Sequence, residues 1–498
     1  MKLKFGTGGL RAVMGEGEDC INFNTIQIAT LGVAAYAKKN TREPSVAISY
    51  DTRNNSEQFA KEAARILALE GCIAYIYPVP TPTPMLSFAV RELKCHLGIC
   101  ITASHNPKEY NGYKVYGKDG CQITNQTAGI IQEEINCADI DSIREWKSFE
   151  ELIKERRIAF ISEMINEAYF AEIKKLRFEQ KSLSGLRIVY TPLNGTGLFP
   201  MMETMGMLGL RDVTLVEEQT KPDGEFPTCP CPNPEEDEAL TLGISLCKKM
   251  NADILLATDP DSDRIGVVAK NGSKYEKLNG NQLGVLLLEY ILKMRKYYET
   301  IPENPIVIKT IVTTSMVDRI AEEYGAKVID TLTGFKYIGE QIGNLEKIGE
   351  VNRFVFALEE SCGYLSGPYV RDKDAIGTAA LICEMTEYYK RQGKTLWKQL
   401  DILYEQYGRY SSILETVEYE QFQEQNRMEK LRNKLKSENT MMYEGILITK
   451  YEDYQQGLRG LPKSNVIKMW LNNGTTIVVR PSGTEPKLKI YKEMYIGQ

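Results

Sequence analysis

The sequence Leu97-Gly98-Ile99-Cys100-Ile101 is an uninterrupted apolar run, and it leads into the polar residues Thr102-Ala103-Ser104-His105-Asn106-Pro107. The run predicts a buried β-strand, because it is short, carries no charge and is followed by turn residues. Pro107 stops any regular continuation, so Ser104 and His105 are expected on a turn at the strand end. A hydroxyl beside an imidazole can face a cleft there and react, although a polar loop that only closes a strand has the same pattern.

The same order of strand, helix, strand, helix and strand occurs three times. The predicted strands are residues 45–50, 73–77 and 97–102, then 186–190, 213–216 and 252–258, then 305–308, 326–329 and 353–358. The predicted helices are residues 57–69, 84–93, 200–207, 235–250, 315–324 and 336–343. This alternation indicates mostly parallel or mixed α/β sheets in three similar domains. Each third strand ends in a polar cluster, and open α/β sheets bind ligands at that edge, so the three clusters are expected to face one cleft.

The last part of the chain differs in composition. A highly charged segment, residues 419–436, predicts a helix, and short strands are predicted at residues 446–448, 466–470, 476–479 and 487–491. These elements indicate a smaller C-terminal α+β domain. A length of 498 residues suits three or four domains. We expect their boundaries at residues 1–165, 166–278, 279–405 and 406–498.

Composition excludes several classes of function. Hydrophobic residues make up 43% of the chain and charged residues 26%, as in ordinary globular proteins. The net charge of −6 disfavours a nucleic-acid partner. The sequence shows neither an apolar signal core nor a long uncharged apolar run, so we expect no membrane contact and a cytoplasmic location. The eleven cysteines are scattered and are expected to be reduced, and with only two histidines a structural zinc is not expected.

Three carboxylates alternate in Asp259-Pro260-Asp261-Ser262-Asp263-Arg264, directly after a predicted buried strand. Such a density of negative charge predicts a site for a hard divalent cation, and Mg²⁺ fits because it keeps coordination positions open for a phosphate oxygen or water. An acidic surface turn is the plain alternative. A calcium loop is disfavoured, because Arg264 and an apolar strand follow where that loop requires glycine.

Two other loops offer groups that bind phosphate. Arg480-Pro481-Ser482-Gly483-Thr484 supplies a guanidinium, two hydroxyls and a glycine that lets backbone N–H groups approach a ligand, although an ordinary hairpin turn has similar residues. Gly6-Thr7-Gly8-Gly9-Leu10-Arg11 combines glycines with a cation but follows no strand, so it is not a dinucleotide fingerprint.

The third domain contributes acids and cations. Glu359-Glu360-Ser361 ends its last strand and can exchange hydrogen bonds with sugar hydroxyls, although charges at strand ends are often only solvated. Arg371-Asp372-Lys373-Asp374 precedes an apolar helix predicted over residues 375–389, and Asp374 is the expected N-cap. A nucleophilic hydroxyl, a metal triad, a hydroxyl-binding loop and a phosphate loop together predict phosphoryl transfer through a phosphoserine.

Over essentially its whole length the chain resembles the α-D-phosphohexomutase family, which includes phosphoglucomutases and phosphomannomutases. The resemblance is carried, in the family's order, by TASHNP at 102–107, DPDSDR at 259–264, EES at 359–361 and RPSGTEP at 480–486. It implies four domains in a heart-shaped arrangement around a central cleft.

The resemblance also implies the catalytic and metal residues. Phosphorylated Ser104 gives its phosphoryl group to a hexose monophosphate, a 1,6-bisphosphate turns over in the cleft, and the other phosphoryl group returns to Ser104. Mg²⁺ is bound by an oxygen of phosphorylated Ser104 together with Asp259, Asp261 and Asp263. The matching positions for proton transfer, with acid and base unassigned, and the cation of the N-terminal loop are His105, Lys114, Lys373 and Arg11.

By the same resemblance, the sugar and its distal phosphate are bound by residues from several loops. These are Arg264, Thr333, Gly334, Lys336, Glu359, Ser361, Arg371, Arg480, Ser482, Gly483 and Thr484. Details of Phe5–Arg11, Thr333–Lys336 and Val370–Ala375 resemble the branch of Gram-positive bacterial phosphoglucomutases and animal phosphopentomutase-like enzymes.

The resemblance predicts interconversion of glucose 1-phosphate and glucose 6-phosphate, with glucose 1,6-bisphosphate as intermediate and activator. Glu359-Glu360-Ser361-Cys362-Gly363-Tyr364 lacks the histidine that some mannose-tolerant members carry after the sugar loop, so mannose and ribose phosphates stay open as substrates. A serine- and metal-dependent phosphatase and a non-catalytic sugar-phosphate binder are the alternatives from other classes. The sequence leaves open whether the protein is a monomer or a dimer.

Overall fold

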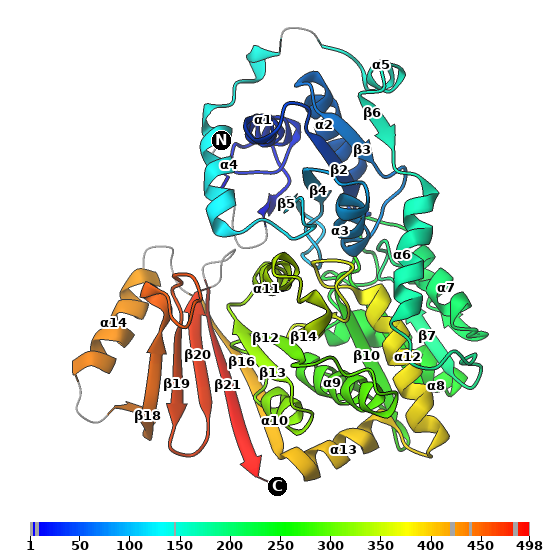
Figure 1. Cartoon of the computed structure of the whole chain (residues 1–498), viewed down its shortest axis with the longest axis vertical. Coiled ribbons are helices and arrows are strands. Elements are labelled where there is room, and N and C mark those ends of the chain that lie inside the picture. The colour runs from blue at the N-terminus through cyan, green and yellow to red at the C-terminus, as the bar shows by residue number, and fades with distance from the viewer. Residues whose placement is uncertain are drawn as a thin grey trace.

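The computed structural model describes residues 3–4, 9–143, 146–418, 424–437, 441–481 and 487–497. Three α/β domains follow one another along the chain, and a domain built mainly of strands ends it (Figure 1). The first domain is blue to cyan in Figure 1, the second and third are green to yellow, and the last is orange to red beside the third.

The first three sheets share a core of four strands in the same order. The first sheet has the order β1-β5-β4-β2-β3-β6, the second β11-β10-β9-β7-β8 and the third β13-β12-β14-β15. In each, the first strand of the predicted copy (β2, β7 or β12) pairs in parallel with the second and the third, and the third pairs with an antiparallel fourth. The predicted threefold repeat is therefore present.

The strand bounds are as follows. In the first sheet they are β1 (Leu10–Val13), β2 (Ser45–Tyr50), β3 (Ile73–Ile76), β4 (Leu97–Ile101), β5 (Tyr110–Gly117) and β6 (Ile158–Phe160). In the second they are β7 (Arg187–Thr191), β8 (Asp212–Leu215), β9 (Ile254–Thr258), β10 (Ile265–Asn271) and β11 (Lys274–Leu278). In the third they are β12 (Ile306–Thr310), β13 (Lys327–Thr331), β14 (Phe354–Glu359) and β15 (Gly363–Leu365).

Helices cover both faces of the first sheet. The helices before the second domain are α1 (Phe23–Asn40), α2 (Ser56–Leu69), α3 (Thr83–Glu92), α4 (Asn125–Cys137), α5 (Phe149–Lys154) and α6 (Glu163–Lys175), with a 3₁₀ turn η1 (Ile140–Ser142). Ile26 of α1, Phe59 of α2 and Ile131 of α4 share one core with the sheet. Leu86 of α3 belongs to a different core, which lies against the neighbouring domains.

That second core joins the first three domains into one packed body. It contains Tyr169 of α6, Met201 of the second domain and Tyr364 of β15, all almost fully buried. The helices of these two domains are α7 (Leu198–Met207), α8 (Asp237–Met250), α9 (Gly280–Tyr297), α10 (Met316–Glu323), α11 (Phe335–Lys347), α12 (Ala375–Arg391) and α13 (Leu396–Tyr407), with 3₁₀ turns η2 (Glu217–Gln219) and η3 (Val351–Arg353). Asp374 caps α12 as predicted, because its carboxylate accepts the N–H groups of Ile376 and Gly377.

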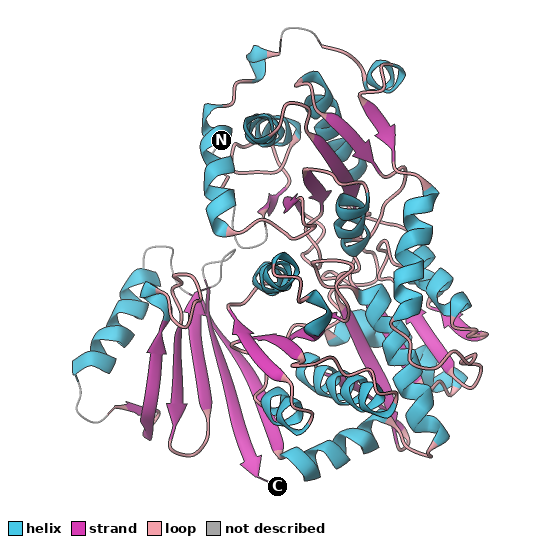
Figure 2. Cartoon of the chain, viewed as in Figure 1, coloured by secondary structure: helices cyan, strands magenta, loops and turns pink. Residues whose placement is uncertain are grey.

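The C-terminal domain is an antiparallel sheet with a helix on its outer side (Figure 2). Its strand order is β16-β21-β20-β19-β18-β17. Its elements are β16 (Arg409–Glu418), α14 (Glu424–Ser437), β17 (Met442–Tyr443), β18 (Ile446–Asp453), η4 (Tyr454–Gln456), β19 (Ile467–Leu471), β20 (Thr476–Pro481) and β21 (Lys487–Gly497). Residues 419–423 of the predicted charged helix lie outside the described residues, and α14 confirms the rest through Lys436.

The C-terminal domain docks on the third domain. Val466 and Val478 pack against Ile311 and Leu332 in a small apolar cluster. The Glu493 carboxylate accepts hydrogen bonds from the N–H and Oγ of Ser315, at distances of 2.7 to 3.1 Å.

Two expectations from composition can be compared with the structure. All eleven cysteines are free thiols, as predicted. Among the described residues, none of the helices combines the length and the apolar character needed to cross a membrane.

Candidate active site

The loops that follow β4, β9 and β14 meet at one place. The Asp261 carbonyl, in the loop after β9, accepts the N–H of Thr83 in the first domain, and Arg264 forms an isolated β-bridge with Gly363 after β14. Each loop contains a non-glycine residue with a left-handed backbone: Ser104 (φ 52°), Ser262 (φ 51°) and Cys362 (φ 60°). A backbone of this kind costs about 1–3 kcal/mol and persists only where its surroundings hold it, and such residues cluster at functional sites.

Ser104 points at the acidic loop of the second domain. Its Oγ donates a 2.6 Å hydrogen bond to Asp259 Oδ2 and lies 3.1 Å from Nδ1 of His105. The residue is 3% exposed. The predicted nucleophile and the predicted metal loop are therefore adjacent, although they are separated by more than 150 positions of the sequence.

A buried arginine fixes the backbone of the Ser104 loop. Arg53 donates to the carbonyl oxygens of Ser104, Asn106, Pro107 and Tyr110, and so ties the whole turn together. Asp51 lies 3.3 Å from Arg53 Nε and accepts the Thr102 hydroxyl at 2.6 Å. Burial lowers the pKa of Arg53, and Asp51 partly compensates. Removal of either member of such a buried pair leaves the other charge without compensation.

The three aspartates form a buried cluster that suits a metal ion. One carboxylate oxygen from each of Asp259, Asp261 and Asp263 lies within 4.8 Å of the others. Within the described part of the chain, the Oδ1 atoms of Asp261 and Asp263 are buried without a hydrogen-bond partner, so each has lone pairs available. Burial and the other two carboxylates raise the pKa of Asp259 well above its usual value. A hard divalent cation would remove that repulsion, and oxygen donors of this kind suit Mg²⁺.

Two lysines from other domains reach the same carboxylates. Lys114 Nζ of β5 lies 2.7 Å from Asp261 Oδ2, and Lys373 Nζ lies 3.1 Å from Asp263 Oδ2. Burial alone would lower the pKa of each ammonium, but Asp261 and Asp263 raise the pKa of Lys114, and Asp263 and Asp372 raise that of Lys373. Thr83 adds a 2.8 Å hydrogen bond to Asp261. Domains one, two and three therefore each contribute to one charged centre.

His105 and Arg11 complete the side of the first domain. Burial, with the nearby Arg264 and Arg11 guanidinium groups, lowers the pKa of His105 well below its usual value, so its imidazole is neutral. Arg11 lies on β1 and donates a 2.8 Å hydrogen bond to Asn106 Oδ1. The glycine-rich segment before it, residues 5–8, lies outside the described residues.

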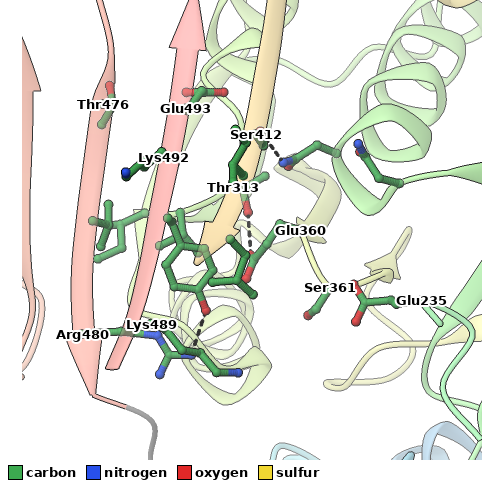
Figure 3. A pocket seen from close by; sticks show the side chains of 18 of the residues that line it. Glu235, Thr313, Glu360, Ser361, Ser412, Thr476, Arg480, Lys489, Lys492 and Glu493 are labelled. Carbon is green, nitrogen blue, oxygen red and sulfur yellow. Dashed lines mark hydrogen bonds between the residues drawn. The ribbon is translucent and has the colours of Figure 1, made fainter. Parts of the chain in front are cut away.

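A cavity of about 450 Å³ extends from His105 and Arg264 toward the C-terminal domain. Its wall includes Ser361 and Arg480, which Figure 3 shows on opposite sides. Ser361 belongs to residues 359–361, here called the sugar loop, and Arg480 lies on β20. Arg480 donates to the Tyr491 hydroxyl at 3.1 Å. The predicted phosphate-binding residues Ser482, Gly483 and Thr484 follow Arg480 and lie outside the described residues.

The two glutamates of the sugar loop have different surroundings. Glu360 accepts the Thr310 hydroxyl at 3.1 Å, within the third domain. Glu359 Oε1 accepts the backbone N–H of Gly334 at 2.9 Å, and Gly334 has a φ of 113° that favours glycine. Burial raises the pKa of Glu359 to about 7, against the opposing effect of Lys373. Thr333 precedes Gly334 in the same loop and is half-buried.

Two residues expected to bind substrate, Arg371 and Lys336, are buried and have partners within the protein. Arg371 is 0% exposed, its Nη2 lies 3.0 Å from Glu346 of α11, and its Nη1 donates to the carbonyls of Pro368 and Val370. The guanidinium therefore has partners inside the protein, and its role as a substrate ligand stays a prediction. Lys336 is 3% exposed and donates a 2.7 Å hydrogen bond to Asn125 of the first domain, while burial lowers its pKa to about 8.

Several residues of the site were not predicted from the sequence. Asp51 and Arg53 directly follow β2, so a charged pair at the end of a buried strand was an available signal. Thr83 has no comparable signal, because it lies among prolines before the predicted helix of residues 84–93. Glu235 was predicted only as the first residue of a helix, whereas α8 begins at Asp237. Glu235 pairs with Arg264 at 3.2 Å and lines the cavity.

Three family models match most of the chain. They are the α/β/α domains I, II and III of phosphoglucomutase/phosphomannomutase, and they match residues 2–140, 167–272 and 279–407.

Curated relatives match nearly the whole chain. A phosphoglucomutase from Staphylococcus haemolyticus is 37% identical over 508 residues, which cover 99% of this chain and 91% of that protein. The phosphoglucomutase of Staphylococcus aureus strain USA300 is 34% identical, with coverage of 98% and 89%. Among solved structures, the open form of pp63/parafusin, a phosphoglucomutase from Paramecium, has a TM-score of 0.74 at 19% identity and covers 99% of this chain and 90% of that chain, which shows the shared fold.

Proposed function

The chain belongs to the phosphoglucomutase and phosphomannomutase family, and from that premise we propose that it is a phosphoglucomutase that interconverts glucose 1-phosphate and glucose 6-phosphate. One observation carries the assignment of Ser104 as the phosphoryl carrier. Its hydroxyl lies 2.6 Å from Asp259, within a buried triad of carboxylates at the edge of a cavity. The identity of the sugar rests on the relatives, which are named phosphoglucomutases at 34–37% identity.

Each half of the proposed reaction exchanges one P–O bond for another. The bond between phosphorus and Oγ of phosphorylated Ser104 breaks, and a bond forms between that phosphorus and the free hydroxyl oxygen of the hexose monophosphate. The hydroxyl proton of the sugar passes to one side chain of the site, and a proton from an acidic group of the site passes to Ser104 Oγ, which is left as a hydroxyl. The resulting glucose 1,6-bisphosphate turns around, and Ser104 then takes the other phosphoryl group by the reverse steps.

The residues of the charged centre have distinct tasks in this proposal. Asp259, Asp261 and Asp263 would hold Mg²⁺ together with an oxygen at Ser104, and the bound ion would neutralise charge on the transferring phosphoryl oxygens. Lys114 and Lys373 approach the same place as fixed cations. His105, at 3.1 Å from Ser104 Oγ, and the two lysines are the candidates for proton transfer.

Residues in and beside the cavity can bind the sugar and its distal phosphate. Ser361 lines the cavity and Glu359 ends β14 just before it; both can exchange hydrogen bonds with hydroxyls near the axis about which the sugar turns. Arg264 and Arg480 both line the cavity; Arg480 can pair with the phosphate that is not reacting, while Arg264 lies on the side of the carboxylate triad. Ser482, Gly483 and Thr484 would complete that phosphate grip. A second phosphate site supports a mutase over a phosphatase, because a phosphatase needs only one phosphate site and free access for water.

A coupled assay tests the proposed activity and its sugar. Glucose 1-phosphate, mannose 1-phosphate and ribose 1-phosphate are compared at equal concentration, with and without glucose 1,6-bisphosphate, while free phosphate is measured in parallel. We expect fastest isomerisation with glucose 1-phosphate and stimulation by the bisphosphate. Faster turnover of mannose or ribose phosphate would overturn the choice of sugar, and release of phosphate in place of isomerised sugar would overturn the mutase reaction.

A further inference from the structure

Arg264 lies between the aspartate triad of residues 259–263 and the cavity next to Ser361. Its backbone N–H donates to Asp259 Oδ1 at 3.0 Å, and its backbone forms a β-bridge with Gly363 beyond the sugar loop. Its side chain lines the cavity. The direction in which this guanidinium points therefore affects both the carboxylate triad and the ligand space.

The Arg264 guanidinium has an acidic group on either side. On the cavity side, Nη1 lies 3.2 Å from Glu235 Oε2. On the triad side, Nε lies 4.0 Å from Asp263 Oδ1. Both Arg264 Nε and Asp263 Oδ1 are buried without a hydrogen-bond partner among the described residues, so a small rotation would join them. That contact would use an oxygen that a divalent cation needs.

We propose that Glu235 is a positioning residue that holds the Arg264 guanidinium on the cavity side and so keeps Asp263 Oδ1 available to the divalent cation. The inference deepens the proposed function and rests on it, since it concerns the metal of that same site. Figure 3 shows Glu235 beside Ser361, so the held guanidinium is also presented to the sugar cavity.

The loop that carries Glu235 is fixed by its own contacts. Asn233 Oδ1 accepts the N–H of Glu235 at 3.1 Å, and the Lys277 ammonium donates to the Glu235 carbonyl. Pro234 lies directly on β10, because a Cβ added to Gly266 would be 2.6 Å from the Pro234 carbonyl oxygen. Prolines also restrict the backbone on the N-terminal side of Glu235. A carboxylate on such a loop can hold a partner in place.

The test is a double-mutant cycle on the binding of metal, without turnover. Four unphosphorylated proteins are titrated calorimetrically with Mn²⁺, a divalent cation that replaces Mg²⁺ in this experiment. They are the parent, E235Q, R264A and the double variant. We expect E235Q to bind Mn²⁺ about fivefold more weakly than the parent, and the same change to have no effect in the R264A background. The control E238Q removes an exposed carboxylate of α8 and should bind as the parent does.

Two results would overturn the inference. Equal Mn²⁺ affinity of E235Q and the parent would show that Arg264 does not move onto Asp263. An equal loss in both backgrounds would show that Glu235 acts only by its charge through space. Melting temperatures of all variants exclude unfolding as the cause. Failure of the cycle leaves the mutase assay unaffected, so the two proposals are tested separately.

Discussion

Ser104 combines a reactive position with an unusual backbone. A left-handed conformation with φ of 52° directs its Oγ at Asp259, while Thr102 Oγ1 accepts its N–H at 2.8 Å. Serine tolerates this backbone better than a β-branched residue does. The hydroxyl is therefore set in place before any substrate arrives.

Replacement of Ser104 by alanine should remove the mutase reaction and leave the binding of substrate. Alanine cannot accept a phosphoryl group, so we expect kcat to fall about a thousandfold or more. The measurements are the coupled assay for kcat and calorimetric titration with glucose 1-phosphate for Kd. Full activity in purified S104A would contradict the role of this residue as carrier.

Glu359 predicts a pH dependence of stability. Burial raises its pKa from 4.5 to about 7, so the folded protein binds this proton more tightly than the unfolded chain does. The contribution of Glu359 to the free energy of unfolding is therefore largest at low pH and decreases as the pH rises through about 7. In E359Q this decrease should be absent. Urea unfolding of both proteins at pH 5, 6, 7 and 8 measures the difference, and parallel curves would contradict the prediction.

At the scale of elements, the strands that end at the site were predictable from the sequence. The antiparallel strand β5, which pairs with one of them, was not. The apolar runs before Ser104, Asp259 and Glu359 predicted three strands that end at the site, and β4, β9 and β14 confirm them. β5 was missed because Tyr110–Gly117 contains polar residues and glycines, and it is a strand only because it pairs with β4 and β1. That strand places Lys114 at the triad, so its contact depends on pairing that local sequence does not encode.

Among the individual site residues, some positions follow from the local sequence and others only from tertiary packing. Asp259, Asp261 and Asp263 are close together because they are neighbours in the sequence, and their clustering was predicted. Arg371 was noted as a cation before a predicted helix and was assigned to substrate by resemblance, whereas its pairing with Glu346 of α11 follows from packing that the sequence does not show.

The Ser104 loop depends on the geometry of one guanidinium. Arg53 donates to four backbone carbonyls of that loop, which the single ammonium of lysine cannot reproduce. In R53K we expect kcat to fall at least about tenfold and the free energy of unfolding to fall by about 3 kcal/mol. Steady-state kinetics and urea unfolding measure the two effects. The control R65K changes an arginine of α2 that pairs with Glu62, and its kcat should not change. Unchanged kcat in R53K would show that the loop needs no such support.

At the scale of the whole molecule, the cavity is closed on one side by the docked C-terminal domain. The largest core spans the first three domains, whereas the C-terminal domain meets the third through a small apolar cluster and a few polar contacts. The smaller interface is the one expected to open first, and its opening would move Arg480 away from Ser361.

Loss of the Glu493 contact should favour opening of the interface between the C-terminal domain and the third domain. In E493A, Ser315 loses the acceptor for its N–H and Oγ, so we expect a larger radius of gyration in solution scattering and a KM for glucose 1-phosphate raised about fivefold. The control K450Q removes an ammonium that pairs with Glu452 inside the C-terminal domain. An unchanged radius and KM in E493A would show that other contacts hold the domain.

The common strand order of the first three sheets gives each of these domains one equivalent loop. Each of these sheets has a loop between its third strand and the antiparallel fourth. Because that loop is anchored at both ends by paired strands, its residues can diverge without altering the sheet. Equivalent strand ends in the three sheets carry a serine, a set of aspartates and a pair of glutamates, so the three domains divide the chemistry of one site among them.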